Sequence, residues 1–205
     1  MTGKLAKAVR NPGVALAYAL SVARGHWVRV SCRVRGVRFE AGRNLRVGGR
    51  LVVRGPGRVV FGDDVIVERT VTPWTYAADA VIEVGSRSFL NGTSFGCAER
   101  ITIGERAILS DVSISDTDFH SLHVDRHRAD APVRVRPVVI GTNVWVGARA
   151  GVLPGTTIGD NAVVGFGAVC RGRLRGDMIY VGNPAQAVRP VPGSAAERPA
   201  TDAPA

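Results

Sequence analysis

The chain has 205 residues, of which 45% are hydrophobic and 21% are charged, and its formal net charge is +10. This length and apolar fraction suit one globular domain and exclude a largely disordered chain. The 25 glycines and the aromatic share of only 6% indicate many turns and small inward side chains. The basic excess leaves three classes of partner open: nucleic acid, a membrane surface and a small anionic ligand.

The positive charge is concentrated at the N-terminal end. Residues 1–60 contain 13 Lys and Arg residues against the single acid Glu40, whereas residues 61–205 contain 14 basic and 16 acidic residues. The first part therefore carries +12 and the rest −2. Residues 1–60 have no sequence pattern of a nucleic-acid-binding motif, so we expect no nucleic-acid partner.

Residues 1–35 form a basic, amphipathic segment with two interpretations. The uncharged run Val14–Ala23 follows Lys4, Lys7 and Arg10 and resembles a signal-peptide core. Alternatively, Asn11 caps a helix whose first residue is Pro12. We favour the helix, because the chemistry that the rest of the chain predicts needs a cytoplasmic cosubstrate. Such a helix either packs on the domain or lies on an anionic membrane surface.

From residue 140 onward the chain repeats every six residues. A period of six fits neither a helix nor a simple strand alternation, but it is typical of a triangular parallel β-helix, where Gly with Asn or Asp turns the corners. Residues 61–65, 84–90 and 103–109 carry weaker copies. We predict an all-β domain over residues 36–190. The inward positions are Ile140, Val146, Val152, Ile158, Val164 and Cys170, each followed after four residues by a small or β-branched one, from Val144 to Ala168.

The repeats stop in a polar insertion over residues 115–137. It holds three of the four histidines, His120, His123 and His127. Acyl transfer to a hydroxyl or amine needs a general base near neutral pKa, which histidine supplies. His120 is the best candidate, because it follows a coil directly and would be held in place. Asp118 could orient the imidazole, contact a sugar or simply form a turn.

Neither a metal site nor a disulfide framework is predicted. Zinc ligands must converge from separate segments, yet no histidine lies between His26 and His120. The cysteines Cys32, Cys97 and Cys170 are odd in number and far apart, and no C-x-x-C pair occurs. This usage is typical of a reducing cytoplasm.

Three stretches resemble a known family. These are "SDTDFHSL", "RPVVIGTNVWVGARAGVLPGTTIGDNAVVGFGAVC" and "YVGNPAQAVR". Over roughly residues 60–190 the chain resembles the left-handed parallel β-helix, hexapeptide-repeat acyltransferases. Within them it is similar to the sugar and polysaccharide O-acetyltransferases related to galactoside and maltose acetyltransferases. The resemblance implies a left-handed β-helix, acetyl-CoA as cosubstrate, a sugar or glycan acceptor and a homotrimer with its site between neighbouring subunits.

The resemblance also assigns roles to single residues. His120 matches the catalytic histidine, while Asn91 and Trp145 match acceptor-binding positions, to which Asp118 is added. Asn91 is equally consistent with a corner residue, and Trp145 with packing between coils or subunits.

For coenzyme A, the resemblance places backbone groups of Ala148 and Phe166 on the pantetheine arm. Arg171 and Arg189 match a polar and a basic position near the phosphates, and Arg173 replaces a lysine that is usual in the family. Arginines suit phosphates because they form bidentate, charge-assisted bonds.

Together these inferences predict an acetyl-CoA-dependent O-acetyltransferase that acts on a sugar hydroxyl, with His120 as general base and direct transfer. A sugar-amine N-acetyltransferase, a non-catalytic β-helical scaffold and an anion-binding module are the alternatives. We expect no metal, a cytoplasmic location and a basic N-terminal part near the inner membrane face. Residues 191–205, rich in Pro and Ala, are predicted to be a disordered tail.

Overall fold

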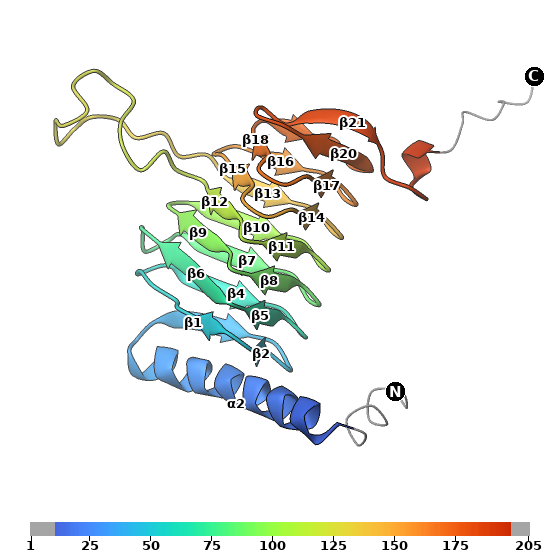
Figure 1. Ribbon diagram of the computed structural model, residues 1–205. Coiled ribbons are helices and arrows are strands. Elements are labelled where there is room, and N and C mark those ends of the chain that lie inside the picture. The colour runs from blue at the N-terminus through green and yellow to red at the C-terminus, as the bar shows by residue number, and fades with distance from the viewer. Residues whose placement is uncertain (1–10, 198–205) are drawn as a thin grey trace, which may run out of the picture.

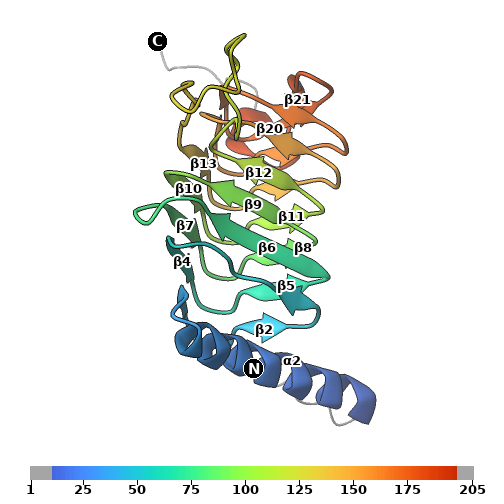
Figure 2. The ribbon, with the colours of Figure 1, turned by 90° about the vertical axis from the view of Figure 1, so that its left-hand side faces the viewer.

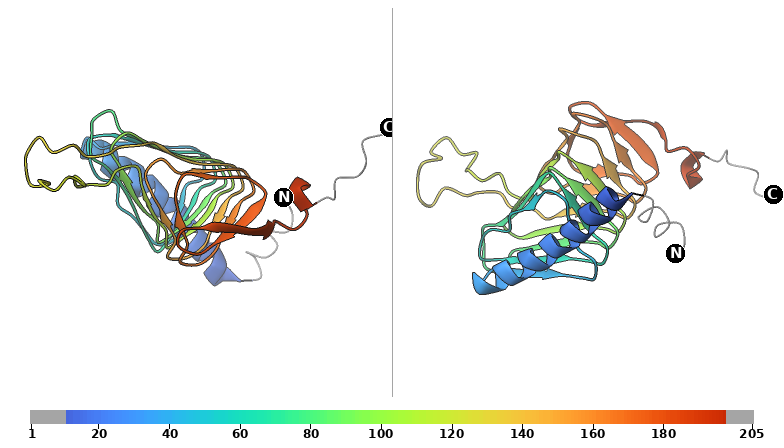
Figure 3. Two further views of the ribbon diagram at one scale, coloured as in Figure 1. Left: turned by 90° about the horizontal axis from the view of Figure 1, so that it is seen from above. Right: turned by 60° about the horizontal axis from the view of Figure 1, so that its bottom comes forward.

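The computed structural model describes residues 11–197. Lys4, Lys7, Arg10 and the last eight residues of the predicted tail lie outside the described residues. One helix, α2 (Pro12–Val34), precedes a stack of short strands that form three sheets (Figure 1). Seen from above, the coils have a triangular outline with one sheet on each side (Figure 3, left).

Each of the first six coils contributes one strand to each sheet, and the last coil contributes β19 to the first sheet and β20 to the second. The first sheet contains β1 (Arg38–Ala41), β4 (Arg58–Phe61), β7 (Val81–Val84), β10 (Arg100–Ile103), β13 (Val138–Ile140), β16 (Thr157–Ile158) and β19 (Arg173–Leu174). The second contains β2 (Arg46–Val47), β5 (Ile66–Glu68), β8 (Phe89–Asn91), β11 (Ile108–Ser110), β14 (Trp145–Val146), β17 (Val163–Val164), β20 (Met178–Val181) and β21 (Gln186–Pro190). The third contains β3 (Arg50–Leu51), β6 (Thr70–Thr75), β9 (Ser94–Cys97), β12 (Ser113–Ser115), β15 (Gly151–Val152) and β18 (Val169–Cys170).

All neighbouring strands are parallel except β20 and β21, which pair antiparallel at the end of the stack. The first sheet has seven strands, one from each coil. This arrangement matches a left-handed β-helix of hexapeptide repeats and confirms the predicted fold class, including the N-terminal helix and the insertion.

The core is a set of ladders inside the triangle. Ile103, Ile140, Ile158 and Leu174 stand in register in the first sheet, and all four are buried. Burying one such side chain contributes roughly 1.5–3 kcal/mol. All six inward positions predicted from the period of six are buried, as are the small residues four positions later. The stacked aliphatic side chains therefore make each coil depend on its neighbours.

The predicted corner chemistry is confirmed at two stacked asparagines. Asn143 and Asn161 have φ of 56° and 59°, in the left-handed region that Asn tolerates better than most residues. Their amides also join the coils. Asn143 Nδ2 donates to Asn161 Oδ1 at 2.9 Å, and Asn161 Nδ2 donates to Asp177 Oδ1 at 2.9 Å.

Helix α2 covers the end of the stack that begins with β1 and β2 (Figures 1 and 2). The run Val14–Ala23 lies inside it. Asn11 stands at the N-cap and Pro12 at the first helical position, but the Asn11 side chain makes no capping hydrogen bond, so that part of the prediction is wrong. The backbones approach closely at Gly25, where a Cβ would lie 2.1 Å from the carbonyl oxygen of Leu45.

Residues 191–197, where we predicted the tail to begin, contact the last coil. The backbone N–H of Val191 donates to the carbonyl of Asp177 at 2.8 Å, and residues Ala195–Glu197 form one turn of 3-10 helix. This contact with the last coil anchors residues that composition alone assigns to the tail.

Candidate functional site

Residues 116–137 leave the stack between β12 and β13 as a long projecting loop (Figure 1). Its two arms pair where they leave the coils. Thr117 and Val135 form an antiparallel bridge, and the N–H of Arg136 donates to the carbonyl of Asp116 at 2.8 Å. The base of the loop is therefore a two-stranded stem, in the position where the repeats were predicted to stop.

Asp116 fixes this stem to the preceding coil. Its carboxylate is buried and accepts hydrogen bonds from the backbone N–H groups of Ala98, Glu99 and Arg100 at 2.7, 2.8 and 2.7 Å. It also contacts the Cys97 thiol, and burial together with this carboxylate raises the pKa of Cys97. Sequence reasoning missed Asp116, although an aspartate directly after a buried strand was a usable signal.

Asp118 holds the stem from its other side. Its carboxylate accepts two hydrogen bonds from the Arg134 guanidinium, at 2.9 and 3.1 Å, and is mostly buried. A bidentate pair of this kind fixes orientation as well as position. Of the roles left open for Asp118, the structure records the contact with Arg134 and no contact with the imidazole of His120 among the described residues.

His120 follows this anchored stem directly. Its backbone N–H donates to the carbonyl of Asp118 at 2.6 Å, and its side chain is exposed. The preceding Phe119 has φ of 61°, an unfavourable conformation for a bulky residue, which marks a position held by its surroundings. The Phe119 ring packs edge-on against Tyr76 at 5.3 Å, above Gly96, where a Cβ would lie 2.5 Å from Phe119 Cζ. The coils thus determine where His120 projects.

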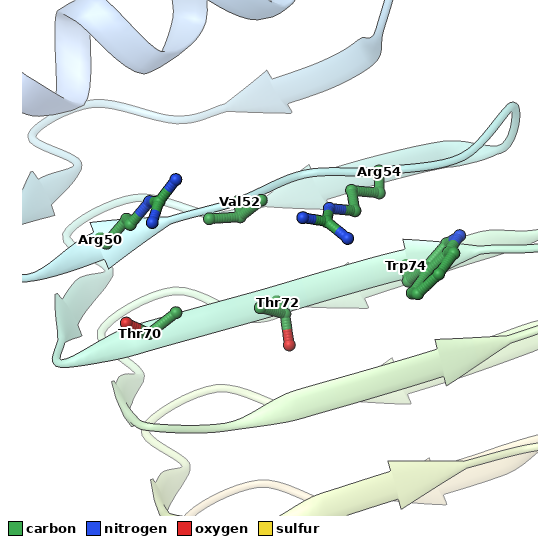
Figure 4. Close-up of a pocket in the computed structure, with 6 residues that line it drawn as sticks. All are labelled: Arg50, Val52, Arg54, Thr70, Thr72 and Trp74. Carbon is green, nitrogen blue, oxygen red and sulfur yellow. The ribbon is translucent and has the colours of Figure 1, made fainter.

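An aromatic row runs from Phe119 along the third sheet to a shallow pocket. Tyr76 stacks on Trp74 at 5.3 Å, and the Arg54 guanidinium lies 5.5 Å from the centroid of the Trp74 ring. Figure 4 shows the pocket between β3 and β6, with Arg50 and Trp74 at opposite ends. Its volume is about 270 Å³, and its lining consists of Arg50, Val52, Arg54, Thr70, Thr72 and Trp74.

This pocket carries positive charge. Among residues 11–197, neither Arg50 nor Arg54 forms an ion pair with a carboxylate. Sequence reasoning missed the pocket, but the alternation of Arg50, Val52 and Arg54 was the available signal, since residues two apart in a strand share a face. The outward side chains thus offer charge and an aromatic surface to an anionic ligand.

Asn91 and Trp145 both lie on the second sheet. Asn91 belongs to β8 and Gly92 takes the left-handed turn, so the corner interpretation of Asn91 is wrong. Its Oδ1 atom is buried without a hydrogen-bond partner among the described residues, and Trp145 is half-exposed. The loop of His120 leaves from the corner between the third and first sheets, opposite the second sheet. One chain therefore does not bring Asn91 and Trp145 together with His120.

Two of the predicted coenzyme A positions lie side by side. Ala148 and Phe166 occupy the same corner in successive coils, and the Ala148 carbonyl accepts a hydrogen bond from the Gly167 N–H at 2.9 Å. The Phe166 ring is 69% exposed, with the Arg149 guanidinium 5.6 Å from its centroid. This corner offers backbone groups beside an exposed aromatic ring.

The three arginines assigned to phosphates lie at the end of the stack far from α2 (Figure 1). Arg171 and Arg173 flank a corner two coils beyond the loop, while Arg189 lies in β21. All three are exposed, and within residues 11–197 none pairs with a carboxylate. Their charges are available to an anion.

No group of three or more His, Cys, Asp or Glu side chains within residues 11–197 is arranged to hold a metal ion. Over the same residues, no helix combines the length and apolar character needed to cross a membrane.

Comparison with known proteins places these features in a family. Residues 137–172 match the model of the bacterial transferase hexapeptide (six repeats), the stretch in which the period of six is cleanest. This chain carries hexapeptide repeats over that stretch. It is 30% identical over 167 residues to a probable acetyltransferase of Mycobacterium tuberculosis, an alignment that covers 80% of this chain and 48% of the relative.

The hexapeptide-repeat chain also resembles galactoside O-acetyltransferase of Escherichia coli, with 32% identity over 92 residues, which is 44% of each protein. It thus spans about half the length of these curated relatives. Among solved structures, AntD, an N-acyltransferase from Bacillus cereus in complex with dTDP and 3-hydroxybutyryl-CoA, matches with a TM-score of 0.64 and 20% identity over 78% of this chain and 87% of AntD. A polysialic-acid-specific acetyltransferase, NeuO, matches with a TM-score of 0.50 and 19% identity over 73% of this chain and 80% of NeuO. These structural likenesses establish the shared β-solenoid fold.

Proposed function

We propose that this chain is an acetyl-CoA-dependent O-acetyltransferase that acts on a sugar hydroxyl of a glycan or glycoconjugate. The observation that carries the proposal is His120, exposed on a loop base that Asp116 and Asp118 anchor to the coils. Relatives named acetyltransferases, among them galactoside O-acetyltransferase, support this reaction class. AntD in complex with 3-hydroxybutyryl-CoA supports an acyl-CoA as the donor.

In the proposed reaction His120 acts as general base. Its imidazole accepts the proton of the acceptor hydroxyl while that oxygen attacks the thioester carbonyl. The resulting tetrahedral intermediate collapses, the C–S bond breaks, and the imidazolium returns the proton to the departing coenzyme A thiolate. General base catalysis contributes about 10²–10⁴-fold to such a reaction. The proposed transfer is direct and uses no acyl-enzyme on cysteine, because the thiols of Cys32, Cys97 and Cys170 are all buried and burial raises their pKa values.

Coenzyme A is proposed to lie along the C-terminal coils. Its pantetheine arm would follow the corner at Ala148 and Phe166, and Arg171, Arg173 and Arg189 would bind the phosphates. The unpaired state of these arginines among the described residues supports this placement, since no internal carboxylate competes for them.

A homotrimer is part of the proposal. Asn91 and Trp145 lie on the sheet opposite the corner that carries His120, so only a second copy can bring these groups together. Asn91 is proposed as an acceptor-binding residue, since its Oδ1 has no hydrogen-bond partner among the described residues. The projecting loop supplies the reach toward a neighbour (Figure 3, left).

The acceptor itself is proposed to carry a negative charge. The aromatic row from Phe119 leads to the pocket of Arg50 and Arg54, whose guanidinium groups suit a phosphate or a carboxylate. Two structural neighbours act on or bind anionic compounds, polysialic acid and dTDP, which supports this class of acceptor. We place the reaction on the cytoplasmic side, where acetyl-CoA is available, and near the inner membrane face because of the basic N-terminal part.

The test measures release of the coenzyme A thiol from acetyl-CoA with the full chain and a panel of neutral, phosphorylated and amino sugars. We expect turnover with a hydroxyl acceptor, and a loss of at least about 10²-fold in His120→Ala. His127→Ala is the matched control from the same loop and should keep its activity. A preference for amino sugars would favour the N-acetyltransferase, and no turnover without coenzyme A binding would leave the scaffold.

The charged pocket is tested in the same assay. Arg50→Gln with Arg54→Gln should raise KM for an anionic acceptor by roughly 10-fold while KM for acetyl-CoA stays the same. Arg43→Gln is the control, because Arg43 is exposed but already pairs with Asp63 at 2.9 Å. Equal KM values for charged and neutral acceptors would contradict this part of the proposal.

A further inference from the structure

Helix α2 has a second apolar face, opposite the one that packs on the coils. The inward face contains Ser21, Gly25, Val28 and Cys32, which are half-buried or buried. Because 3.6 residues make one turn, spacings of four and three residues place side chains in one line along a helix. The outward face repeats these spacings, and all its members are exposed. This outer stripe consists of Leu16, Leu20, Ala23, Trp27, Val30 and Val34.

The outer stripe is unusual for a surface in water. Leu16, Trp27 and Val34 are 61%, 69% and 81% exposed. Contiguous apolar surface of this kind marks a site of contact. Figure 3 (right) shows α2 lying across the end of the stack, with the coils on one side of it. Within residues 11–197 nothing packs on the other side, and the stripe from Leu16 to Val34 runs about 27 Å along the helix.

The positive charge beside the outer stripe indicates what binds to it. Residues 11–39 contain no acid, and Arg24, His26, Arg33 and Arg35 lie on or beside the exposed sides of the helix. A second copy of α2 would bring the same positive charge against this one, whereas anionic lipid headgroups are complementary to it. A tryptophan in the stripe suits the membrane interface, where its ring is partly buried and its N–H stays hydrated.

The helix is also held so that the stripe faces away from the protein. Tyr18 Oη donates to Asn44 Oδ1 at 3.1 Å, and Arg24 Nη1 donates to the Gly48 carbonyl at 2.9 Å. With the close approach at Gly25, these contacts fix the rotation of α2 on the first coil. The outer stripe is therefore presented by a rigid base and needs no rearrangement to become accessible.

We propose that the outer stripe inserts into the headgroup region of a bilayer rich in anionic phospholipid, with α2 parallel to the surface and the coils standing on it. The proposal extends the proposed function by giving the membrane location a structural basis in α2. In a homotrimer with parallel coils, three stripes would lie at the same end, and their binding would reinforce one another.

The test is co-sedimentation of the full chain with vesicles, without any acceptor or acetyl-CoA. One set of vesicles is phosphatidylcholine alone, and the other contains about one third phosphatidylglycerol. We expect binding to the anionic vesicles that is at least about 10-fold stronger than to the neutral ones and that weakens as salt is raised.

Two variants assign the binding to the stripe. Trp27→Ser with Val30→Ser should weaken binding to anionic vesicles by at least about 10-fold, because it removes apolar surface that would enter the bilayer. Val139→Ser is the matched control, since Val139 is an exposed valine of β13 on the side of the coils. Circular dichroism spectra that match the wild type establish that both variants fold.

Two outcomes of the vesicle experiment overturn the proposal. The first is wild-type protein that does not bind anionic vesicles. The second is a stripe variant that binds them as tightly as the wild type. If the wild type does not bind vesicles and light scattering finds a smaller oligomer for the stripe variant than for the wild type, a second copy of the chain covers the stripe instead. Vesicle binding without acyl transfer would reject the proposed enzyme and leave this proposal standing, so the two failures are distinguishable.

Discussion

The coils and the loop of residues 116–137 are stabilised in opposite ways. In a coil the backbone N–H and C=O groups pair with the coils above and below, and the side chains inside form continuous ladders. The loop has no such neighbours, so it depends on a few side chains at its base, chiefly Asp116 and the Asp118–Arg134 pair. A repetitive scaffold thus supplies rigidity, and a handful of specific contacts transmits it to His120.

The rate of thiol labelling should show the largest difference between the coils and the loop. Burial raises the pKa of Cys170 to about 11. At pH 8 its thiolate fraction is then about one in a thousand, and the thiolate is the reactive form. We expect a cysteine introduced by Leu122→Cys, in the exposed loop, to react at least about 10²-fold faster with an aromatic disulfide reagent than Cys170, from the thiolate fractions alone.

The direction in which folding stability changes with pH follows from the raised pKa of Cys170. Folding stability that depends on a neutral Cys170 is present below its unfolded pKa and declines as the pH rises toward 11. Labelling should therefore accelerate in alkaline solution, together with unfolding followed by circular dichroism. Rapid labelling of Cys170 at pH 8 in folded protein would contradict the view of the coils as closed.

The anchor of the loop should give the next largest effect. Asp116→Ala leaves three backbone N–H groups at the base of the loop without their acceptor and removes a buried side chain, so we expect the free energy of unfolding to fall by about 3 kcal/mol. Urea denaturation measures this loss. Asp130→Ala is the control, because Asp130 lies in the same loop but pairs only with the exposed Arg128. Equal midpoints for the two variants would show that the stem does not depend on Asp116.

The positioning of His120 should respond more modestly. Arg134→Gln breaks the bidentate pair beside His120, and we expect kcat to fall by roughly 10-fold with KM for acetyl-CoA little changed. Arg128→Gln breaks a similar pair with Asp130 at the far end of the loop and should leave kcat as it is. A common effect on both variants would mean that the loop acts as a whole rather than through its stem.

The sequence was most informative where the structure is most repetitive. A buried position every six residues is a local constraint, and the ladder of Ile140 and Ile158 reflects it directly. The earlier coils were harder to place, because strands such as β6 run to six residues and the turns between them vary in length. Their hexapeptide pattern is correspondingly less regular.

For the candidate site, the sequence identified His120 by its motif, but it did not identify the residues that hold His120 in place. Asp116 bonds to residues 16–18 positions away, and Tyr76 reaches Phe119 across two coils. Such contacts depend on how the coils stack, which a linear pattern does not specify. Helix α2 shows the same effect, since two opposite apolar faces leave little amphipathic contrast in the sequence although one is buried and the other is not.

The stack also sets a distance. Strand β12, from which the loop departs, is the fourth strand of its sheet counted from α2, and neighbouring strands lie about 4.8 Å apart. The loop therefore leaves the stack three strand spacings, roughly 14 Å, beyond the first coil, a height fixed by the number of coils rather than by any side chain. Gain or loss of one coil would move His120 by about one strand spacing while both ends of the molecule kept their structure. A solenoid of this kind can adapt to acceptors of different length in discrete steps.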